Sequence, residues 1–392
     1  MEQYFFEWLN LLLRWLHVIT GIAWIGSSFY FVWLDNSLRK PDSQELIDKG
    51  VDGELWAVHG GGFYNPQKYM VAPKQLPEHL HWFYWESYWT WMSGFALFVV
   101  LYLFNAQTFL IDKNVFAWGS SAAAIVASLV YLVMGWFVYD VICRAFGQKK
   151  NGDLIVGVLV FAYVIVATWI ACHLFSGRAA FLLTGAALAT AMSANVLMVI
   201  IPGQRKTVAA MKAGETPDAI HPMRAKQRSV HNTYFTLPVL FAMLSNHYSM
   251  TYSAENNWLV LVLIMLAGAL IRQFFVLKHK GIRGYKFFAA GAIILLGVAI
   301  WMAPPPAPPA PPAPKFAEVQ TIINARCAMC HNAQVNQKNI QLHTPELIAK
   351  NAQAMAQQSV ITRIMPLANA TQMTEEERAK LGAWVSAGAK LE

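Results

Sequence analysis

Eight stretches of the sequence are apolar and long enough to cross a lipid bilayer as helices, and they constrain the fold more than any other feature. A bilayer-spanning helix needs about 20 predominantly apolar residues. The stretches lie at 8–34, 83–104, 115–138, 153–174, 179–201, 233–249, 258–277 and 285–303, and the sixth is the shortest and the richest in polar residues. The 392 residues are 56% hydrophobic and only 13% charged, a balance typical of membrane proteins. We therefore expect an all-α fold, a polytopic membrane helix bundle of about eight spans.

The basic residues between these stretches predict the orientation of the bundle. The first, third, fifth and seventh loops contain eighteen Lys and Arg residues, whereas the other loops and the N-terminal tail contain two. Loops rich in Lys and Arg stay on the cytoplasmic side, so both termini are expected on the periplasmic side of a bacterial inner membrane. The net charge of +8 is then explained by these loops beside the lipid bilayer. We expect no binding of nucleic acid. No cleavable signal peptide is expected, because the first apolar stretch is too long and no small-residue cleavage site follows it.

A proline-rich segment divides the chain into two predicted domains. Residues 304–314 read PPPAPPAPPAP, a composition that favours a stiff polyproline II spacer. This linker would join a membrane domain, residues 1–303, to a periplasmic domain, residues 315–392. In the second domain the pattern predicts a helix over 316–325 and a closing helix that begins at a Thr374–Glu377 capping box. The two helices are expected to pack against each other.

The second predicted domain contains the attachment signature of a c-type haem. Cys327, Cys330 and His331 form a C-x-x-C-H motif. The two thiols can form thioethers with the porphyrin vinyl groups, and His331 can bind the iron from one face. The candidates for the second axial ligand are His343, Met365 and Met373. We favour Met365, which lies in a Met-Pro pair, because a thioether ligand keeps the reduction potential high. The motif thus predicts a small mono-haem cytochrome c that carries one haem c.

Histidines in the membrane domain are candidate ligands of an additional, non-covalent haem b. Arg14, His17 and Gly21 share one face of the first span, and an ionisable residue inside a span is by default a functional candidate. His17 is either a haem ligand or a histidine hydrogen-bonded to a neighbouring helix. His173 and His247 lie at the outer ends of the fourth and sixth spans; each is either a haem ligand or an interfacial histidine.

Two polar stretches begin at the cytoplasmic face of the predicted bundle. One contains Gln227, Arg228, His231 and Asn232, and the other contains Glu86 among aromatic residues. An arginine fork, amide groups and aromatic rings together suit a flat, anionic heterocycle that forms hydrogen bonds. The alternative is an interfacial aromatic belt whose neighbouring charges contact lipid headgroups.

Four motifs give the chain a resemblance to a known family. They are RWLHVITGIAWIG at 14–26, HGGGFY at 59–64, HNTYFTLPV at 231–239 and LSNHY at 244–248. With the C-terminal cytochrome c motif, these segments resemble the bacterial integral-membrane urate oxidases that use cytochrome c as electron acceptor. The resemblance covers essentially the whole chain.

The resemblance implies an oxidoreductase of purine degradation. Urate and water would give 5-hydroxyisourate, and the two electrons would pass to the fused cytochrome. A periplasmic cytochrome c or a terminal oxidase would then accept them. We assign Arg228, Gln227 and Asn232 to binding of the urate anion, and His231 or Glu86 to the role of general base. The alternative function is a membrane cytochrome that relays electrons for quinol or a partner dehydrogenase and has no substrate of its own.

Overall fold

The computed structural model describes residues 2–303, 314–335 and 339–391. Eight long helical segments form the larger part of the molecule. They are α1 (Glu2–Ser37), α3 (Trp85–Phe98) with the π-helix η1 (Val99–Leu103), α5 (Ser121–Phe146), α6 (Gly152–Leu174), α7 (Gly177–Ala194), α9 (Ile220–Leu244), α11 (Asn257–His279) and α12 (Tyr285–Trp301). Helix α7 continues through the π-helix η2 (Asn195–Ile200) into α8 (Ile201–Lys212).

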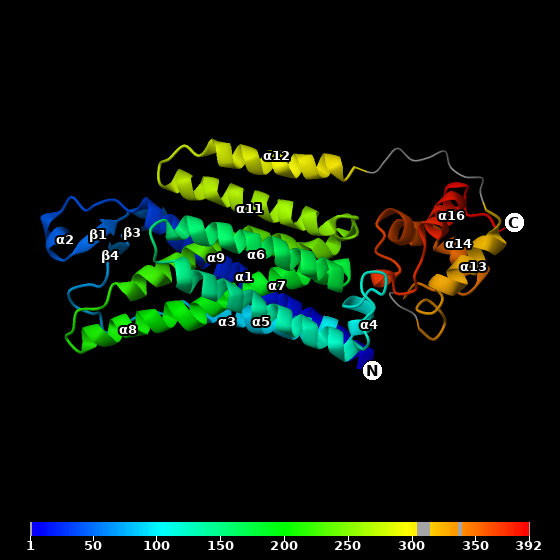
Figure 1. Ribbon diagram of the computed structural model, residues 1–392, viewed down its shortest axis with the longest axis horizontal. Helices are drawn as coiled ribbons and strands as arrows, with labels where there is room; N and C mark the ends of the chain where they lie inside the picture. The colour runs from blue at the N-terminus through cyan, green and yellow to red at the C-terminus, as the bar shows by residue number, and fades with distance from the viewer. Residues whose placement is uncertain (1, 304–313, 336–338, 392) are drawn as a thin grey trace.

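The long helices lie side by side along the long axis of the molecule (Figure 1). Helix α1 begins at the end of the bundle where the C-terminal domain lies, and the loops rich in Lys and Arg lie at the opposite end (Figure 1). Two short helices, α4 (Ala106–Phe109) and α10 (Ser249–Tyr252), and the 3-10 helix η3 (Ser245–His247) lie toward the C-terminal domain. Both termini are therefore at one end of the bundle, as an even number of helices requires.

Five of the described helices are long and apolar enough to cross a membrane. They are Tyr4–Ser37, Ser121–Phe146, Gly152–Leu174, Gly177–Lys212 and Asn257–His279, and Tyr285–Trp301 is a shorter apolar helix. The predicted all-α bundle is thus compatible with a membrane protein. The predicted third span begins six residues too early, because the Ser120 side chain caps α5 by accepting a 3.1 Å hydrogen bond from the Ala123 N–H.

Helices α5, α7 and α9 approach closely at small residues. A Cβ added to Gly185 of α7 would lie 2.4 Å from the Ala242 Cβ of α9, and one added to Gly135 of α5 would lie 2.7 Å from the Ala187 Cβ of α7. Small residues at such crossings let helix backbones pack tightly in membrane bundles. These crossings bring the polar residues of α5, α7 and α9 within hydrogen-bond reach of one another.

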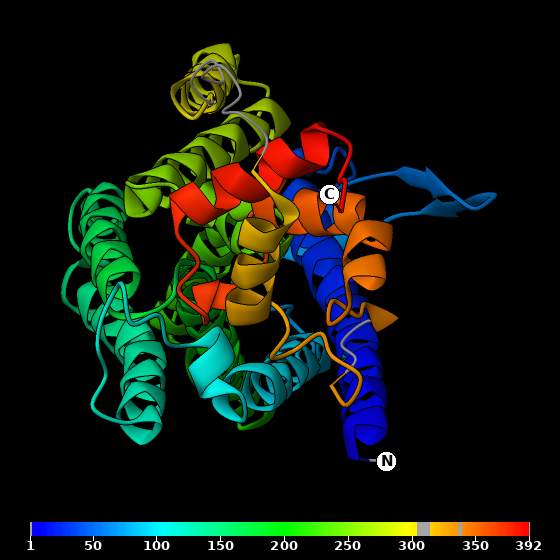
Figure 2. The ribbon, with the colours of Figure 1, turned by 90° about the vertical axis from the view of Figure 1, so that its right-hand side faces the viewer.

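The loop between α1 and α3 contains a helix and four short strands. These are α2 (Gln44–Asp48), β1 (Val51–Glu54), β2 (Ala57–His59), β3 (Gly62–Tyr64) and β4 (Gln67–Tyr69). Strand β1 pairs antiparallel with β4, and β2 pairs antiparallel with β3. Gly60 and Gly61 form the β2–β3 turn with φ angles of 58° and 82°, which glycine adopts without steric cost. The strands project sideways from the helices (Figure 2).

The C-terminal residues form a separate helical domain with its own apolar core. Its helices are α13 (Phe316–Arg326), α14 (Pro345–Lys350), α15 (Ala352–Ala356), η5 (Gln357–Ile361), η6 (Leu367–Asn369) and α16 (Glu375–Ser386). The rings of Phe316 on α13 and Trp384 on α16 lie 5.8 Å apart. Both the predicted contact between these helices and the predicted Thr374–Glu377 capping box are confirmed. The predicted linker falls outside the described residues except for Pro314.

Candidate functional site

A buried ion pair links α5 and α9. Arg228 is 4% exposed and Asp140 is 7% exposed, and Arg228 Nη2 donates a 2.8 Å hydrogen bond to Asp140 Oδ1. The other carboxylate oxygen of Asp140 accepts from Arg144 Nε at 2.5 Å. The Arg228 guanidinium also lies over the Tyr139 ring, with its Cζ 4.9 Å from the ring centroid. Because a buried charge is costly without a partner, Asp140 accounts for the presence of Arg228 inside the bundle.

Two buried asparagines extend this ion pair into a polar network. Arg228 Nη1 donates to Asn195 Oδ1 at 3.1 Å, and Asn195 Nδ2 lies 2.9 Å from both the Tyr139 hydroxyl and Asn232 Oδ1. Asn232 Nδ2 in turn donates to the Met192 carbonyl at 3.0 Å. Asn195 is the first residue of the π-helix η2, and π-helical turns inside α-helices are frequent at functional sites. The network therefore joins α5, η2 and α9 at one place in the bundle.

His231 lies at the edge of this network. Its Nδ1 is 3.0 Å from the Tyr139 hydroxyl oxygen and 3.8 Å from Cys143 Sγ. The histidine is half-buried. If Nδ1–H donates to Tyr139, then Nε2 carries the free lone pair, and this is the tautomer that a general base at Nε2 needs.

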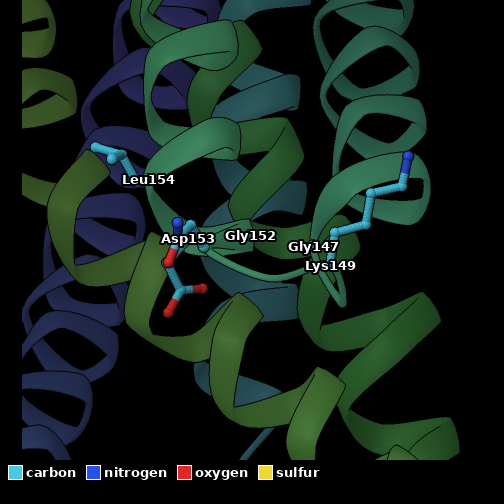
Figure 3. A pocket seen from close by; sticks show the side chains of 6 residues that line it. Gly147, Lys149, Gly152, Asp153 and Leu154 are labelled. Carbon is cyan, nitrogen blue, oxygen red and sulfur yellow. The ribbon is translucent and has the colours of Figure 1, made fainter.

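Gln227 points away from Arg228, toward the turn between α5 and α6. Its Nε2 donates to the Gly147 carbonyl at 2.8 Å and to Asp153 Oδ1 at 2.6 Å. Gly147 leaves room for this side chain, because an added Cβ would lie 2.4 Å from Gln227 Oε1. The turn borders a shallow pocket of about 430 Å³, shown with its lining residues in Figure 3.

Glu86 lies in the first turn of α3 and is half-buried. Its carboxylate forms no hydrogen bond or ion pair with the residues that the structure describes. The structure thus brings Arg228, His231 and Asn232 together, whereas no hydrogen bond among the described residues joins the side chain of Gln227 or Glu86 to the buried network.

Sequence reasoning missed Asp140, Asn195 and Tyr139. Asp140 carried a detectable signal, because a carboxylate within an apolar helix is expensive and needs a partner. The predicted third span ended at residue 138, which left Asp140 outside the membrane. Asn195 had no comparable signal, since a single amide in an apolar stretch does not reveal which helix it faces.

His17 is hydrogen-bonded to α3. Its Nδ1 lies 3.0 Å from the Thr90 carbonyl oxygen and 3.1 Å from the Ser93 hydroxyl. Gly94 permits this approach, because an added Cβ would lie 2.8 Å from the His17 Cε1. When Nδ1–H donates to a carbonyl, Nε2 is left as an acceptor, the form in which histidine binds a metal. The predicted hydrogen bond from His17 to a neighbouring helix is therefore present. The other prediction, that His17 is a haem ligand, is compatible with its free Nε2.

The other two candidate haem ligands of the membrane domain are exposed. His173 stacks on Trp169, with ring centroids 4.2 Å apart, and its Nδ1 lies 2.7 Å from the Trp169 carbonyl oxygen. His247 lies in η3 at the same end of the bundle. Both histidines are therefore at the end nearest the C-terminal domain.

The haem-attachment motif follows α13 directly. Cys327 packs against the apolar core of the C-terminal domain, whereas Cys330 is exposed. Burial raises the pKa of the Cys327 thiol to about 11. His331 Nδ1 lies 3.0 Å from the Ile340 carbonyl oxygen, and donation to this carbonyl leaves Nε2 as an iron ligand. Two thiols and one oriented imidazole are the donor set that a c-type haem requires.

The candidate second axial ligands have different environments. Met373 is 3% exposed and belongs to the apolar core, and His343 is exposed. Met365 is half-buried, and its backbone carbonyl accepts a 2.7 Å hydrogen bond from Arg378 Nη1. The Met365 backbone is thus held in place from α16, while its side chain is less enclosed than that of Met373.

The C-terminal domain contacts the bundle on both sides of Met365. The Ser249 hydroxyl of α10 donates to the Thr362 carbonyl, and α4 packs against η6. The segment from Thr362 to Asn369 therefore contacts α10 and α4 at the end of the helix bundle.

Long apolar helices around a buried network of charged and amide side chains define a membrane-type helix bundle with an internal polar site. The family model described as "Urate oxidase N-terminal" matches residues 3–303, the whole of this bundle, and the chain belongs to that urate oxidase-related family. The match confirms the resemblance at the level of the family and indicates an oxidoreductase with a urate-related function. No curated protein and no solved structure matches the chain.

Proposed function

We propose that the protein is a membrane-bound enzyme that oxidises urate and uses its C-terminal domain as a c-type cytochrome acceptor. Urate and water would give 5-hydroxyisourate, two protons and two electrons. The observation that carries this proposal is the family match over residues 3–303. The fused C-x-x-C-H motif supports the choice of acceptor.

Arg228, Asn232 and Gln227 are the proposed ligands of the polar edge of urate. A guanidinium has five N–H donors, and the hydrogen bonds to Asp140 and Asn195 use two of them. The remaining donors of Arg228 are the groups that would face a substrate. Gln227 would have to exchange one of its bonds at the α5–α6 turn for a bond to urate.

His231 is the proposed general base, and Glu86 is the alternative. The base role uses His231 Nε2 in the tautomer whose Nδ1–H donates to Tyr139. Tyr139 would act as a positioning residue, because it fixes the ring and stabilises the positive charge that develops when Nε2 accepts a proton.

The C-terminal domain is the proposed exit for electrons. Cys327 and Cys330 would form the thioethers, and His331 and Met365 would be the axial ligands. A c-type haem held by these residues takes up and passes on single electrons. The contacts at Thr362 and η6, on both sides of Met365, support electron transfer from the bundle to this domain.

The proposal also includes a placement in the membrane and an additional haem b. We propose that the termini and the cytochrome domain are periplasmic in a bacterial inner membrane, because the basic loops lie at the opposite end of the bundle. If urate enters from the cytoplasmic side, electrons must cross most of the bilayer. A haem b at His17, His173 or His247 would then serve as a relay, and a periplasmic cytochrome c or terminal oxidase would receive the electrons.

Urate-dependent reduction of the C-terminal haem in isolated membranes tests the proposal. The c-type α-band should increase on addition of urate under anaerobic conditions, and a chemical reductant gives the full amplitude. The double variant Cys327→Ala/Cys330→Ala is the matched control without covalent haem. An intact haem c that quinol reduces and urate does not would disprove urate oxidation and favour the electron relay. A pyridine haemochrome measurement counts haem c and haem b in the same preparation.

A further inference from the structure

Helix α11 contains a buried arginine that forms no hydrogen bond or ion pair with the residues that the structure describes. Arg272 is 4% exposed, and its Nε and Nη2 atoms form no hydrogen bond with any residue that the structure describes. Arg272 also takes no part in the ion pairs of the described chain. A buried guanidinium without a counter-charge is costly, and the described residues supply no anion to this side chain.

The two unpartnered nitrogens lie on one edge of the guanidinium. Nε–H and Nη2–H point in the same direction, and this pair forms the fork by which arginine binds two acceptor atoms of one planar anion. Arg228 differs, because its carboxylate partner Asp140 lies 2.8 Å away. An anion beside Arg228 would therefore meet a neutral pair, whereas an anion beside Arg272 would meet an uncompensated positive charge.

Aromatic and polar side chains surround Arg272. Its Cζ lies 4.3 Å from the centroid of the Phe29 ring of α1. On the neighbouring position of α11, Gln273 accepts a hydrogen bond from the Tyr234 hydroxyl of α9. Gly268 lets α9 approach, because an added Cβ would lie 3.1 Å from the Leu237 Cβ. The arginine therefore lies between α1, α9 and α11, inside the bundle.

A second unpartnered group lies on the same face of α11. His279 Nδ1 is buried and has no hydrogen-bond partner among the described residues. His279 follows Arg272 by seven residues, which is two turns and about 10 Å along the helix axis. Three of the four buried, unpartnered side-chain atoms in the described chain thus belong to Arg272 and His279. The unmet hydrogen-bonding capacity of this face of α11 is therefore concentrated in two residues that lie two helical turns apart.

We propose that the Nε–Nη2 edge of Arg272 binds the anionic edge of urate. This inference rests on the proposed function and identifies the residue that supplies the charge for substrate binding. Tyr234, which contacts α11 through Gln273, follows His231 on α9 by three residues, so the two side chains leave neighbouring parts of that helix surface. The depth of Arg272 and its enclosure by three helices favour a small planar anion over a lipid phosphate, which stays at the membrane surface.

Direct urate binding to purified, haem-loaded protein tests this proposal. In equilibrium dialysis with labelled urate, Arg272→Gln should bind about ten- to hundredfold more weakly than the wild type, because two charge-assisted hydrogen bonds are lost. Arg272→Lys keeps the charge without the fork and should show a smaller loss. Arg283→Gln, an exposed arginine in the loop after α11, is the matched control and should bind urate as the wild type does.

A neutral purine separates charge from shape. The wild type should prefer urate to hypoxanthine, and Arg272→Gln should lose most of that preference. Melting temperature and haem content of each variant report folding. If Arg272→Gln does not fold, the inference is tested with Arg272→Lys, through its urate affinity and its preference for urate over hypoxanthine. Wild-type urate affinity in a folded Arg272→Gln variant, or loss of bound phospholipid or haem b from it with urate binding unchanged, would overturn the inference.

The same experiments distinguish failure of this inference from failure of the proposed function. If the wild type neither binds urate nor passes electrons from it, the proposed function fails. If the wild type reacts with urate, and Arg228→Gln loses binding while Arg272→Gln does not, only the assignment to Arg272 fails.

Discussion

Arg228 and Asp140 form an ion pair with an N–O distance of 2.8 Å between α9 and α5, and both residues are more than nine-tenths buried. The pair replaces the hydration that both charges lose inside the bundle. It also fixes the Arg228 end of the network that reaches Asn195, Asn232, Tyr139 and His231. The polar site is therefore part of the packing of the helices and not an addition to it.

Removal of the Asp140 charge should destabilise the bundle strongly. Asp140→Asn leaves Arg228 buried without a counter-charge, and we expect a loss of about 3–5 kcal/mol in the free energy of unfolding. Denaturant unfolding in detergent measures it. The double variant Asp140→Asn/Arg228→Gln should recover part of the loss, and the exposed Asp42→Asn should stay within about 0.5 kcal/mol of the wild type. A single variant as stable as the control would disprove this role of the pair.

The crossing of α7 and α9 should not tolerate a methyl group. Gly185→Ala places a Cβ 2.4 Å from the Ala242 Cβ, and overpacking of this kind costs about 1–3 kcal/mol. Gly157→Ala on α6 is the matched control, because an added Cβ there meets nothing within 4 Å and alanine favours the helix. Thermal melting of the two variants compares them. Equal melting temperatures would show that the α7–α9 crossing adjusts without cost.

Met365 and Met373 should respond differently to replacement by leucine. Met365→Leu is expected to remove the thioether ligand, abolish the absorption band between thioether sulfur and iron and lower the reduction potential. Met373→Leu replaces a core side chain by one of similar volume. It should lower the free energy of unfolding by less than about 1.5 kcal/mol and leave the spectrum unchanged. Redox titration and visible spectra of the full-length protein decide. The opposite pattern would make Met373 the axial ligand.

The C-terminal domain should lose stability in acid through Glu377. Burial raises the pKa of this carboxyl, but hydrogen bonds from the Thr374 N–H and the Arg326 side chain outweigh that effect and hold the pKa below its usual 4.5. A carboxyl whose pKa is lower in the folded than in the unfolded state stabilises the fold above the unfolded value. That stabilisation is lost as the pH falls from 4.5 through the folded value.

The pH dependence of melting in the full-length protein, followed through haem absorbance, measures this contribution. Glu377→Gln should flatten the decline below pH 4.5. Glu376→Gln, whose exposed carboxylate lies 3.5 Å from Lys380, should leave the decline in place because exposed ion pairs contribute little. An unchanged pH profile in Glu377→Gln would assign the acid sensitivity to another group.

The positions of the long helices could be predicted because hydropathy is local. Each apolar stretch that is long enough for a bilayer became a helix, and the capping box at Thr374 placed the start of α16 correctly. The extent of α9 was predicted less well. The helix begins at Ile220, before the predicted span, and this part includes Arg228 and Asn232, which find partners on α5 and η2. Hydropathy cannot detect polar groups that other helices satisfy.

The sequence alone determined the helical, membrane-type bundle and showed the polar stretch at 227–234, and it predicts the domain division at the proline-rich segment and a haem at the C-x-x-C-H motif. Only the tertiary structure decided which side chains meet. Asp140, Asn195 and Tyr139 come from segments distant in sequence, and their contacts depend on how α5, η2 and α9 cross at small residues. The packing of α5 against α9 pairs Arg228 with Asp140, whereas Arg272 on α11 has no hydrogen-bond or ion-pair partner among the described residues. A sequence shows that both residues are arginines, but the state of each charge depends on its neighbours in space.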